Sequence, residues 1–245
     1  MMELSQYDHK YVRITDKFGE TFSGFARHED REFIMCEYGG DEDGIFIEDV
    51  LIYNSLIASI EEIVPHGTAE LWTEQLVLRR YRPDDAEPLY QRLGTDPEII
   101  QYSGWNPYAT LEMAQETVRS FIDSYENEGS YSWVMDWEDV QIGTIGAYDY
   151  RNDQIEVGFS VVRGWRGRGF ATEALEKVLD YLTENEGISC VTAWCASENA
   201  GSKRVLEKAG MKLVRTEKDG LSVGGNTYDR LIYEYRRKPR ERQSQ

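Results

Sequence analysis

The chain has 245 residues, of which 40% are hydrophobic and 29% are charged. This length allows one large or two modest domains, and the composition excludes a wholly disordered or fibrous protein. The formal net charge of −18 disfavours a nucleic-acid backbone or an anionic membrane as partner and favours a cationic small molecule or basic peptide, although the acidity could equally serve solubility alone.

Targeting signals and cysteine spacing indicate the compartment. Residues 1–10 are polar and lack the basic-then-apolar order of a secretion signal, and no run approaches the about 20 apolar residues that span a bilayer. Cys36, Cys190 and Cys195 have no ligand-like spacing, so neither a disulfide framework nor a zinc site is predicted. We therefore expect a cytoplasmic protein without a metal.

The first part of the chain reads as a meander of short strands. Residues 11–15 and 21–25 alternate between apolar and polar side chains, residues 39–44 form a loop, and residues 45–47 and 56–63 are apolar. Five strands in about 60 residues would close into a small all-β barrel.

The order of features in residues 12–24 and 57–63 resembles an Sm-like or SH3-like barrel, which would occupy residues 1–66. Sm-like proteins commonly bind RNA. Residues 1–70, however, hold five Lys or Arg against sixteen Asp or Glu, a net charge of −11, which would repel RNA phosphates. The barrel is therefore interpreted as a docking element, or as one through which the chain forms a homo-oligomer.

A linker is predicted at residues 64–69, which contain Pro and Gly and lack periodicity, so a second domain would span residues 67–245. Strands are expected at 76–78, 131–136, 141–148, 154–162, 190–195, 212–217 and 226–235, and helices from Pro83, at 111–125, 170–185 and 200–208. This pattern predicts an α+β fold with a mixed, mostly antiparallel sheet flanked by helices. A basic tail from about residue 237 is expected to be disordered.

The most informative stretch is residues 158–174, where a strand turns through glycines into an amphipathic helix. Because Gly167 and Gly169 lack a Cβ, the backbone there can adopt unusual φ values and approach a ligand closely. The first N–H groups of the helix have no intrahelical partner, and at the positive end of the helix dipole they form an anion site that fits a pyrophosphate.

Other phosphate-binding folds fit this stretch less well. A P-loop fails because no Gly-Lys-Ser/Thr follows, and a dinucleotide-binding fold is disfavoured because the preceding strands form a hairpin meander and Thr172 stands at the third glycine position. A mere tight turn would leave unexplained the two arginines interleaved with the two glycines.

The sequence of residues 166–171, Arg-Gly-Arg-Gly-Phe-Ala, resembles the Gln/Arg-x-x-Gly-x-Gly/Ala signature of the GNAT superfamily of N-acetyltransferases. Residues 199–211 are similar to that family's second signature, Asn-x-x-Ser-x-x-x-x-x-Lys-x-Gly-Phe, with Met211 in place of the Phe. Residues 78–86 resemble the branch that acetylates ribosomal-protein N-termini, and the whole likeness spans residues 76–236.

The resemblance implies that acetyl-CoA binds between two splayed strands. The pyrophosphate would lie on the amides of residues 168–172 and the pantetheine along residues 161–163, with Asn199 and Ser202 facing its arm. The implied cofactor-binding residues are Val161, Val162, Arg163, Arg166, Gly167, Arg168, Gly169, Phe170, Ala171, Thr172, Asn199 and Ser202. Helix capping explains Asn199 and Ser202 equally well.

The proton chemistry has to proceed without histidine, because His9, His28 and His66 all precede residue 67. A carboxylate, a tyrosine or a water chain must then deprotonate the acceptor, which arrives as an ammonium. Glu156 is the leading candidate, since it shares a strand face with residues 158, 160 and 162, although a solvated strand carboxylate is the simpler interpretation.

Two departures from the family leave the mechanism open. Leu206 stands where some members carry the tyrosine that protonates the thiolate, and Trp194 stands where some carry a glutamate base. A backbone N–H near Val161 or Val162 is expected to stabilise the oxyanion.

The predicted function is transfer of an acetyl group from acetyl-CoA to a primary amine, which could be a protein N-terminus, a polyamine or another small amine. The alternatives are a non-catalytic acyl-CoA sensor or scaffold, and an RNA-associated factor that uses the barrel and the basic tail.

Overall fold

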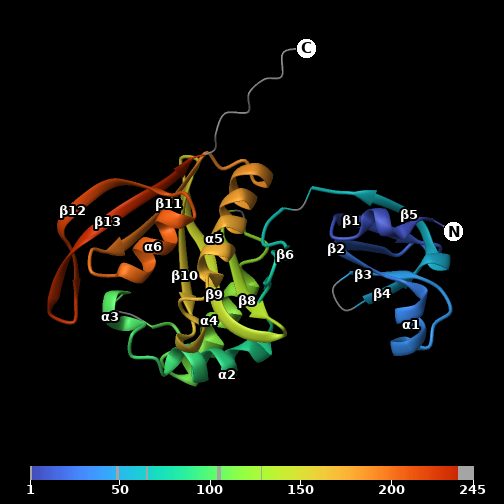
Figure 1. Ribbon diagram of the computed structural model, residues 1–245, viewed down its shortest axis with the longest axis horizontal. Coiled ribbons are helices and arrows are strands. Elements are labelled where there is room, and N and C mark those ends of the chain that lie inside the picture. The colour runs from blue at the N-terminus through green and yellow to red at the C-terminus, as the bar shows by residue number, and fades with distance from the viewer. Residues whose placement is uncertain (1, 48–49, 65, 104–105, 128, 237–245) are drawn as a thin grey trace, which may run out of the picture. The chain divides into compact units, whose positions relative to one another are not determined.

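The computed structural model describes residues 2–47, 50–64, 66–103, 106–127 and 129–236 (Figure 1). The chain divides into two compact units, Met1–Glu70 and Leu71–Gln245, each with its own sheet. The basic tail predicted from residue 237 lies outside the described residues. In the part of the chain that is described, no helix is both long and apolar enough to cross a membrane.

The first unit is a five-stranded antiparallel sheet with strand order β4-β3-β2-β1-β5. Its elements, with η for a short non-α helical turn, are η1 (Leu4–Tyr7), β1 (Tyr11–Asp16), β2 (Thr21–Glu29), α1 (Arg31–Tyr38), β3 (Gly44–Ile47), β4 (Val50–Tyr53), η2 (Asn54–Leu56) and β5 (Ile57–Glu62). Alternate side chains such as Val12 and Ile14 are fully buried in its core. The described residues form no β4–β5 ladder, so closure of the predicted barrel is not confirmed.

Helix α1 is a difference from the predicted all-β meander. It begins at Asp30, whose carboxylate accepts a hydrogen bond of 2.9 Å from the Phe33 N–H, and it ends at Gly39 with φ of 72°. These are an ordinary N-cap and C-cap. Both capping residues can be read in the sequence, but the prediction of an all-β meander did not take them into account.

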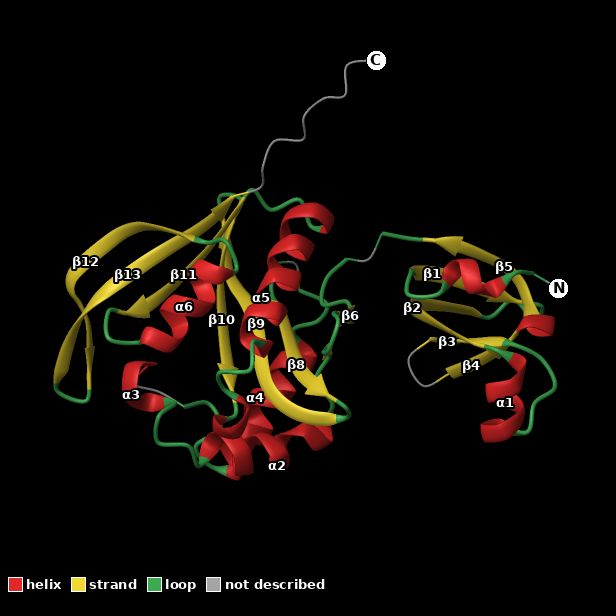
Figure 2. Ribbon diagram, viewed as in Figure 1, coloured by secondary structure: helices red, strands yellow, loops and turns green. Residues whose placement is uncertain are grey.

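The second unit is built on an eight-stranded sheet of order β12-β13-β11-β10-β9-β8-β7-β6 (Figure 2). Its strands are β6 (Leu71–Trp72), β7 (Val77–Arg79), β8 (Tyr131–Trp137), β9 (Val140–Arg151), β10 (Gln154–Val161), β11 (Cys190–Ala196), β12 (Lys212–Val223) and β13 (Asn226–Arg236). Among the described strands of this sheet, only β10 and β11 pair in parallel, which confirms the predicted mixed, mostly antiparallel α+β sheet. Strand β12 continues to Val223 rather than stopping at residue 217, because its hairpin with β13 pairs as far as Asn226.

Helices cover both faces of this sheet. They are η3 (Pro83–Asp85), α2 (Ala86–Leu89), η4 (Tyr90–Gly94), α3 (Ile100–Ser103), α4 (Leu111–Asp123), η5 (Arg163–Trp165), α5 (Phe170–Asp180), η6 (Tyr181–Asn185) and α6 (Ala200–Lys208). Val134 of β8 belongs to the core formed with α2 and α4, whereas its neighbour Trp133 packs edge-on against Tyr181 of η6. Because neighbouring side chains of a strand point to opposite faces, α2 and α4 cover one face, and α5 with η6 the other.

The parallel strands β10 and β11 separate partway along their length. They pair only over residues 154–156, where Glu156 lies opposite Thr192. Beyond that point β10 stays paired with β9 as far as Val161, while β11 stays paired with β13 as far as Ala196. The sheet therefore opens between β10 and β11, with one unpaired edge on each side.

Candidate active site

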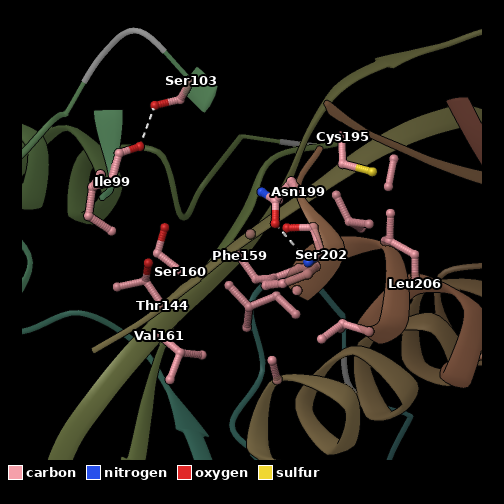
Figure 3. Close-up of a pocket in the computed structure, with 18 of the residues that line it drawn as sticks. Ile99, Ser103, Thr144, Phe159, Ser160, Val161, Cys195, Asn199, Ser202 and Leu206 are labelled. Carbon is pink, nitrogen blue, oxygen red and sulfur yellow. Dashed lines mark hydrogen bonds between the residues drawn. The ribbon is translucent and has the colours of Figure 1, made fainter. Parts of the chain in front are cut away.

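A cleft of about 990 Å³ lies in the second unit where β10 and β11 separate (Figure 3). It is lined by residues of both strands, by the glycine turn that leads into α5, by the start of α6 and by α3. Where the two strands diverge, backbone hydrogen-bonding groups along both edges of the cleft are left without a partner strand.

The backbone of β10 presents alternate amides to the cleft. The Val162 N–H donates to the Ile142 carbonyl of β9 at 2.8 Å, so it points away from β11. Because amides of a strand alternate in direction, the N–H groups of Phe159 and Val161 point toward the gap. Of the two amides expected to stabilise an oxyanion, Val162 is therefore already bonded within the sheet, and Val161 faces the cleft.

The glycine turn adopts the unusual backbone that the sequence predicted. Gly167 has φ of 78° and Gly169 has φ of 98°, and a methyl group built on either would meet no atom within 4 Å. Helix α5 begins at Gly169 without a side-chain cap, whereas the other described helices of eight or more residues, α1, α4 and α6, are capped by Asp30, Thr110 and Asn199. The first amides of α5 thus border an open space at a positive helix end.

The three arginines of the turn have different partners. Arg166 donates to Asp96 and Glu98, each at 2.6 Å, and to the Val161 carbonyl at 2.9 Å, so its side chain braces the end of β10. Arg163 pairs with Glu98 at 3.2 Å. The guanidinium of Arg168 lies over the Trp165 ring, 4.7 Å from its centroid. Of the three, only Arg168 is without an ion pair among the described residues.

Asn199 and Ser202 lie at the start of α6 on the cleft wall. Asn199 accepts a hydrogen bond of 3.0 Å from the Ser202 N–H, so it does cap the helix, and both residues also line the cleft (Figure 3). Cys195 of β11 lines the cleft beside them. Burial raises the pKa of its thiol to about 11, against the lowering effect of Lys203, so the thiol is neutral at physiological pH.

Hydroxyl groups line another part of the cleft wall, on the face of the sheet that α4 covers. The Tyr81 and Tyr108 oxygens lie 3.3 Å apart, and both interact with the Thr144 hydroxyl. Burial raises the pKa of both tyrosines, so they remain uncharged. Ser160 lies opposite Thr144 in the β9–β10 ladder, and the two point the same way in Figure 3.

Glu156 lies at the apex where the strands part. Its carboxylate accepts a hydrogen bond of 2.9 Å from Trp194 Nε1 and interacts with the Tyr148 hydroxyl. Trp194 and Tyr148 line the cleft, but Glu156 does not. Burial first, and then the charge of Glu156, raises the pKa of Tyr148.

The predicted site residues divide into two groups. Those on the cleft lining are Val161, Arg166, Gly167, Gly169, Phe170, Ala171, Thr172, Asn199 and Ser202, whereas Glu156, Val162, Arg163 and Arg168 lie outside it. Sequence reasoning missed Tyr148, Thr144 and Cys195 as cleft residues. Across the described ranges, no group of three or more His, Cys, Asp or Glu side chains is arranged to hold a metal ion.

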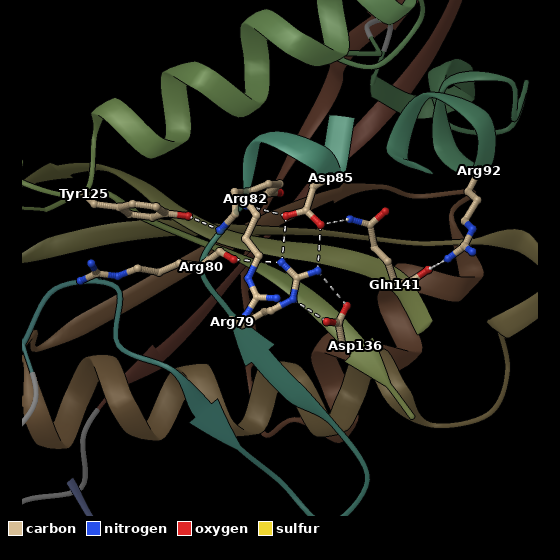
Figure 4. A network of polar contacts seen from close by, with 9 residues as sticks. Arg79, Arg80, Arg82, Asp85, Arg92, Tyr125, Asp136 and Gln141 are labelled. Atoms are coloured by element: carbon tan, nitrogen blue, oxygen red, sulfur yellow. Dashed lines mark hydrogen bonds and ion pairs between the residues drawn. The ribbon is translucent and has the colours of Figure 1, made fainter. Parts of the chain in front are cut away.

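The segment 78–86 contributes Arg79 and Asp85 to a polar network whose members do not line the cleft, although Tyr81 of the same segment does (Figure 4). Arg79 donates two hydrogen bonds of 2.8 Å to Asp85 and one of 2.5 Å to Asp136, and Gln141 donates to Asp85 at 3.1 Å. The network joins β7, η3, β8 and β9. The network therefore attaches the sheet to η3, the turn that leads directly into α2.

A family profile and a sequence relative both identify this chain as similar to N-acetyltransferases. The family profile described as "Acetyltransferase (GNAT) domain" matches residues 75–212. The Bacillus subtilis protein described as "Uncharacterized N-acetyltransferase YoaA" is 30% identical over 176 residues, which cover 70% of this chain and 98% of that protein.

Solved structures share the fold. RimL, a ribosomal alpha-N-protein acetyltransferase in complex with coenzyme A, superposes with a TM-score of 0.63 at 17% identity, covering 67% of this chain and 95% of its own. MccE, a microcin self-immunity acetyltransferase in complex with acetyl-CoA and AMP, superposes with a TM-score of 0.60 at 18% identity, covering 67% and 93%.

Proposed function

Because the chain belongs to the GNAT acetyltransferase family, we propose that it moves an acetyl group from acetyl-CoA to a primary amine by direct attack of the amine on the thioester. The observation that carries this proposal is the cleft between β10 and β11, which opens beside the uncapped start of α5. Relatives of the same fold include one in complex with coenzyme A and one in complex with acetyl-CoA.

The glycine turn is the proposed pyrophosphate site. The open N-terminus of α5 offers amides and a positive dipole end, and Arg168 adds an exposed cation beside it. The remaining predicted contacts would come from the backbone of residues 161–163 and from Asn199 and Ser202, whose position on the cleft wall supports a contact with the pantetheine arm.

The thioester carbonyl would accept a hydrogen bond from a β10 amide that faces the gap. Val161 meets this requirement, and Val162 does not, because its N–H is held by Ile142. Such an amide is fixed by the strand before the substrate arrives, so it can stabilise the developing oxyanion without reorganisation.

The acceptor is proposed to be a primary amine: a protein N-terminus, a polyamine or another small amine. A nucleic acid is not proposed as a partner. The net charge of −18 supports a cationic acceptor, and RimL, named as a ribosomal alpha-N-protein acetyltransferase, supports a protein N-terminus.

The N-terminal unit is proposed as an Sm-like docking or oligomerisation element at residues 1–66, separate from an acetyltransferase domain at residues 67–245. Its strand order supports this assignment, since β1 lies between β2 and β5 and only β4–β5 pairing is missing from a closed barrel among the described strands.

A thiol-release assay tests the proposed function. The full chain is mixed with acetyl-CoA and, in turn, with a short peptide bearing a free N-terminus, a polyamine, an aminoglycoside and an amino acid, and free CoA thiol is measured. At least one amine should stimulate thiol release above the no-amine control. Tight CoA binding by calorimetry without release for any acceptor would favour the acyl-CoA sensor instead.

A further inference from the structure

We infer that the Tyr148 hydroxyl is the group that takes a proton from the acceptor amine, and that Glu156 acts behind it by receiving the proton that Tyr148 gives up. This inference rests on the proposed acetyl transfer and deepens it. It replaces direct deprotonation by Glu156 with a two-step relay.

The first observation is that Glu156 does not itself line the cleft, whereas two residues that contact it do. Its carboxylate is bonded by Trp194 at 2.9 Å and interacts with Tyr148, and only these two partners line the cleft. Either side chain could therefore connect an amine in the cleft with the Glu156 carboxylate. The indole N–H of Trp194 is a donor only, so it cannot accept that proton, whereas a phenol can accept one and donate another.

The second observation is where the Tyr148 hydroxyl lies. A methyl group built on Gly158 would be 2.8 Å from the Tyr148 oxygen, so the phenol extends across Gly158 where a larger residue would displace it. Phe159 is the next residue of β10, about 3.3 Å further along the strand, and its N–H points into the gap. The hydroxyl thus lies about one residue from the Phe159 amide, which faces the gap as the Val161 amide does.

The third observation is a local distortion that brings Tyr148 to this place. The β9–β10 hairpin turns at Asn152 and Asp153, with φ of 52° and 60°, and Arg151 pairs with Gln154. Continued without a shift, this register would put Asp149 opposite Glu156. Asp149 instead has φ of 58°, and the register shifts between Gln154 and Glu156, so that Tyr148 lies opposite Glu156.

The proton balance is complete with these groups. The ammonium of the acceptor gives one proton to the Tyr148 oxygen while the Tyr148 proton passes to Glu156, which leaves a neutral amine and an unchanged phenol. The amine then bonds to the thioester carbon and the C–S bond breaks. One of the two protons on the nitrogen goes to the CoA thiolate, which leaves a neutral amide N–H and a free thiol. Glu156 finally releases its proton to water.

Burial, and then the charged groups around Tyr148, raise the pKa of a phenol that is already neutral at physiological pH. Glu156 on β10 and Asp149 on β9 raise its pKa in addition to burial, and Arg230 on β13 lowers it. Arg230 lies over the Trp194 ring, 4.7 Å from its centroid. Tyr148 therefore works as a relay that is protonated at rest rather than as a phenolate base.

The test compares Tyr148→Phe, Glu156→Gln and the double variant in the thiol-release assay. General-base loss typically costs 10² to 10⁴ in rate, so each single variant should lose about 100-fold or more in kcat. The double variant should lose no more than the worse single variant, because both residues serve one proton path. CoA affinity by calorimetry should stay within about twofold, since neither group is proposed to contact CoA.

A pH profile separates a relay from a structural role. The deficit of Tyr148→Phe should shrink as pH rises from 7 to 9, because the free amine then forms without the relay. A purely structural Tyr148 would give a deficit independent of pH. Tyr150→Phe is the matched control, because Tyr150 lies on the same strand, is 50% exposed and is absent from the cleft lining.

Gly158→Ala supplies a variant that displaces the phenol without removing it. Its methyl group would push against the far end of a flexible side chain, so the protein should fold and lose turnover with unchanged CoA affinity.

If the wild type turns over and Tyr148→Phe keeps more than a third of its activity at pH 7, the relay is wrong and the proposed function stands. A wild type inactive on every amine overturns both.

Discussion

The arginines of the glycine turn show why one motif holds side chains with different roles. Arg166 matches the first position of the family signature, yet its guanidinium binds Asp96, which is only 4% exposed as a side chain, and Glu98. Removing Arg166 would leave a buried carboxylate unpaired, so any loss of CoA binding would include a structural part. The glycines are the cleaner probe of the proposed pyrophosphate site.

Gly169→Ala should weaken CoA binding, with Gly164→Ala as its matched control. Neither new methyl group would meet an atom within 4 Å, but only Gly169 has positive φ, at 98°. The alanine should shift the turn and its amides, at a cost of about 1 to 3 kcal/mol in stability. We expect at least about fivefold weaker CoA binding by calorimetry, equivalent to about 1 kcal/mol of lost hydrogen bonding. Equal affinity in the two variants would remove the pyrophosphate from this turn.

The local geometry of the glycine turn could be predicted from the sequence, but the contact between Glu156 and Tyr148 could not. The strand, the glycines and the helix start fix the turn locally, because φ and capping depend on neighbouring residues. The partner of Glu156 depends on a register shift at Asp149, and a two-residue turn at Asn152 and Asp153 alone predicts a different pairing. Strand register therefore had to come from the structure.

At the scale of elements, the buried Arg79 network shows how the sequence motif of residues 78–86 contributes to the fold. The Asp85 carboxylate accepts hydrogen bonds from Arg79, from the Arg82 N–H at 2.6 Å and from Gln141. Asp136 interacts with Arg79 through a bond of 2.5 Å and a longer contact of 3.5 Å, and burial raises the pKa of its carboxyl despite the nearby guanidinium. Asp85 is thus the better satisfied of the two carboxylates.

Asp85→Asn should therefore destabilise the protein more than Asp136→Asn. Losing one partner of a buried, hydrogen-bonded pair typically costs about 3 to 5 kcal/mol, and we expect Asp85→Asn to approach that range. Asp136→Asn should cost less, because it also removes the burial penalty that raises the pKa of Asp136. Urea unfolding of both variants measures the difference. An equal or reversed order would mean that the Arg79–Asp136 contact is the dominant one.

Element types in the second unit could be predicted because their periodicity is strong, whereas α1 was missed, and the strand separation was expected only from the resemblance to the family. Helix α1 has only eight residues and a weak apolar pattern, so the flanking strands dominated the interpretation. The separation of β10 and β11 is a long-range property. It follows from the point at which pairing stops after Glu156, and nothing in either strand's own residues marks that point.

At the scale of the whole molecule, the acidity is concentrated in one unit. Residues 1–70 carry a net charge of −11 out of −18 for the chain. The argument for a cationic partner therefore applies most strongly to the N-terminal unit, and less to the cleft of the second unit. Long-range attraction would bring a cationic molecule to the N-terminal unit first. That unit should therefore be tested for docking of basic partners.

The second unit should bind CoA by itself if its cleft is complete within residues 67–236. The boundary matters because Glu173 in the first turn of α5 accepts hydrogen bonds from Thr73 at 2.5 Å and from the Gln75 N–H and side chain, each at 2.8 Å. These bonds join the start of the unit to the helix that borders the proposed pyrophosphate site. A fragment beginning at residue 67 keeps them, and one beginning at residue 77 loses them together with β6.

Calorimetry on the two fragments and the full chain tests this division. The fragment from residue 67 should bind CoA within about twofold of the full chain, since a change of RT ln 2 is about 0.4 kcal/mol and lies within the additivity expected of independent units. The fragment from residue 77 should bind more weakly or melt at a lower temperature, because Glu173 loses three hydrogen bonds and the start of α5 is freed. If the fragment from residue 67 is folded by circular dichroism and binds no CoA while the full chain does, the N-terminal unit contributes to the site and the proposed division is wrong.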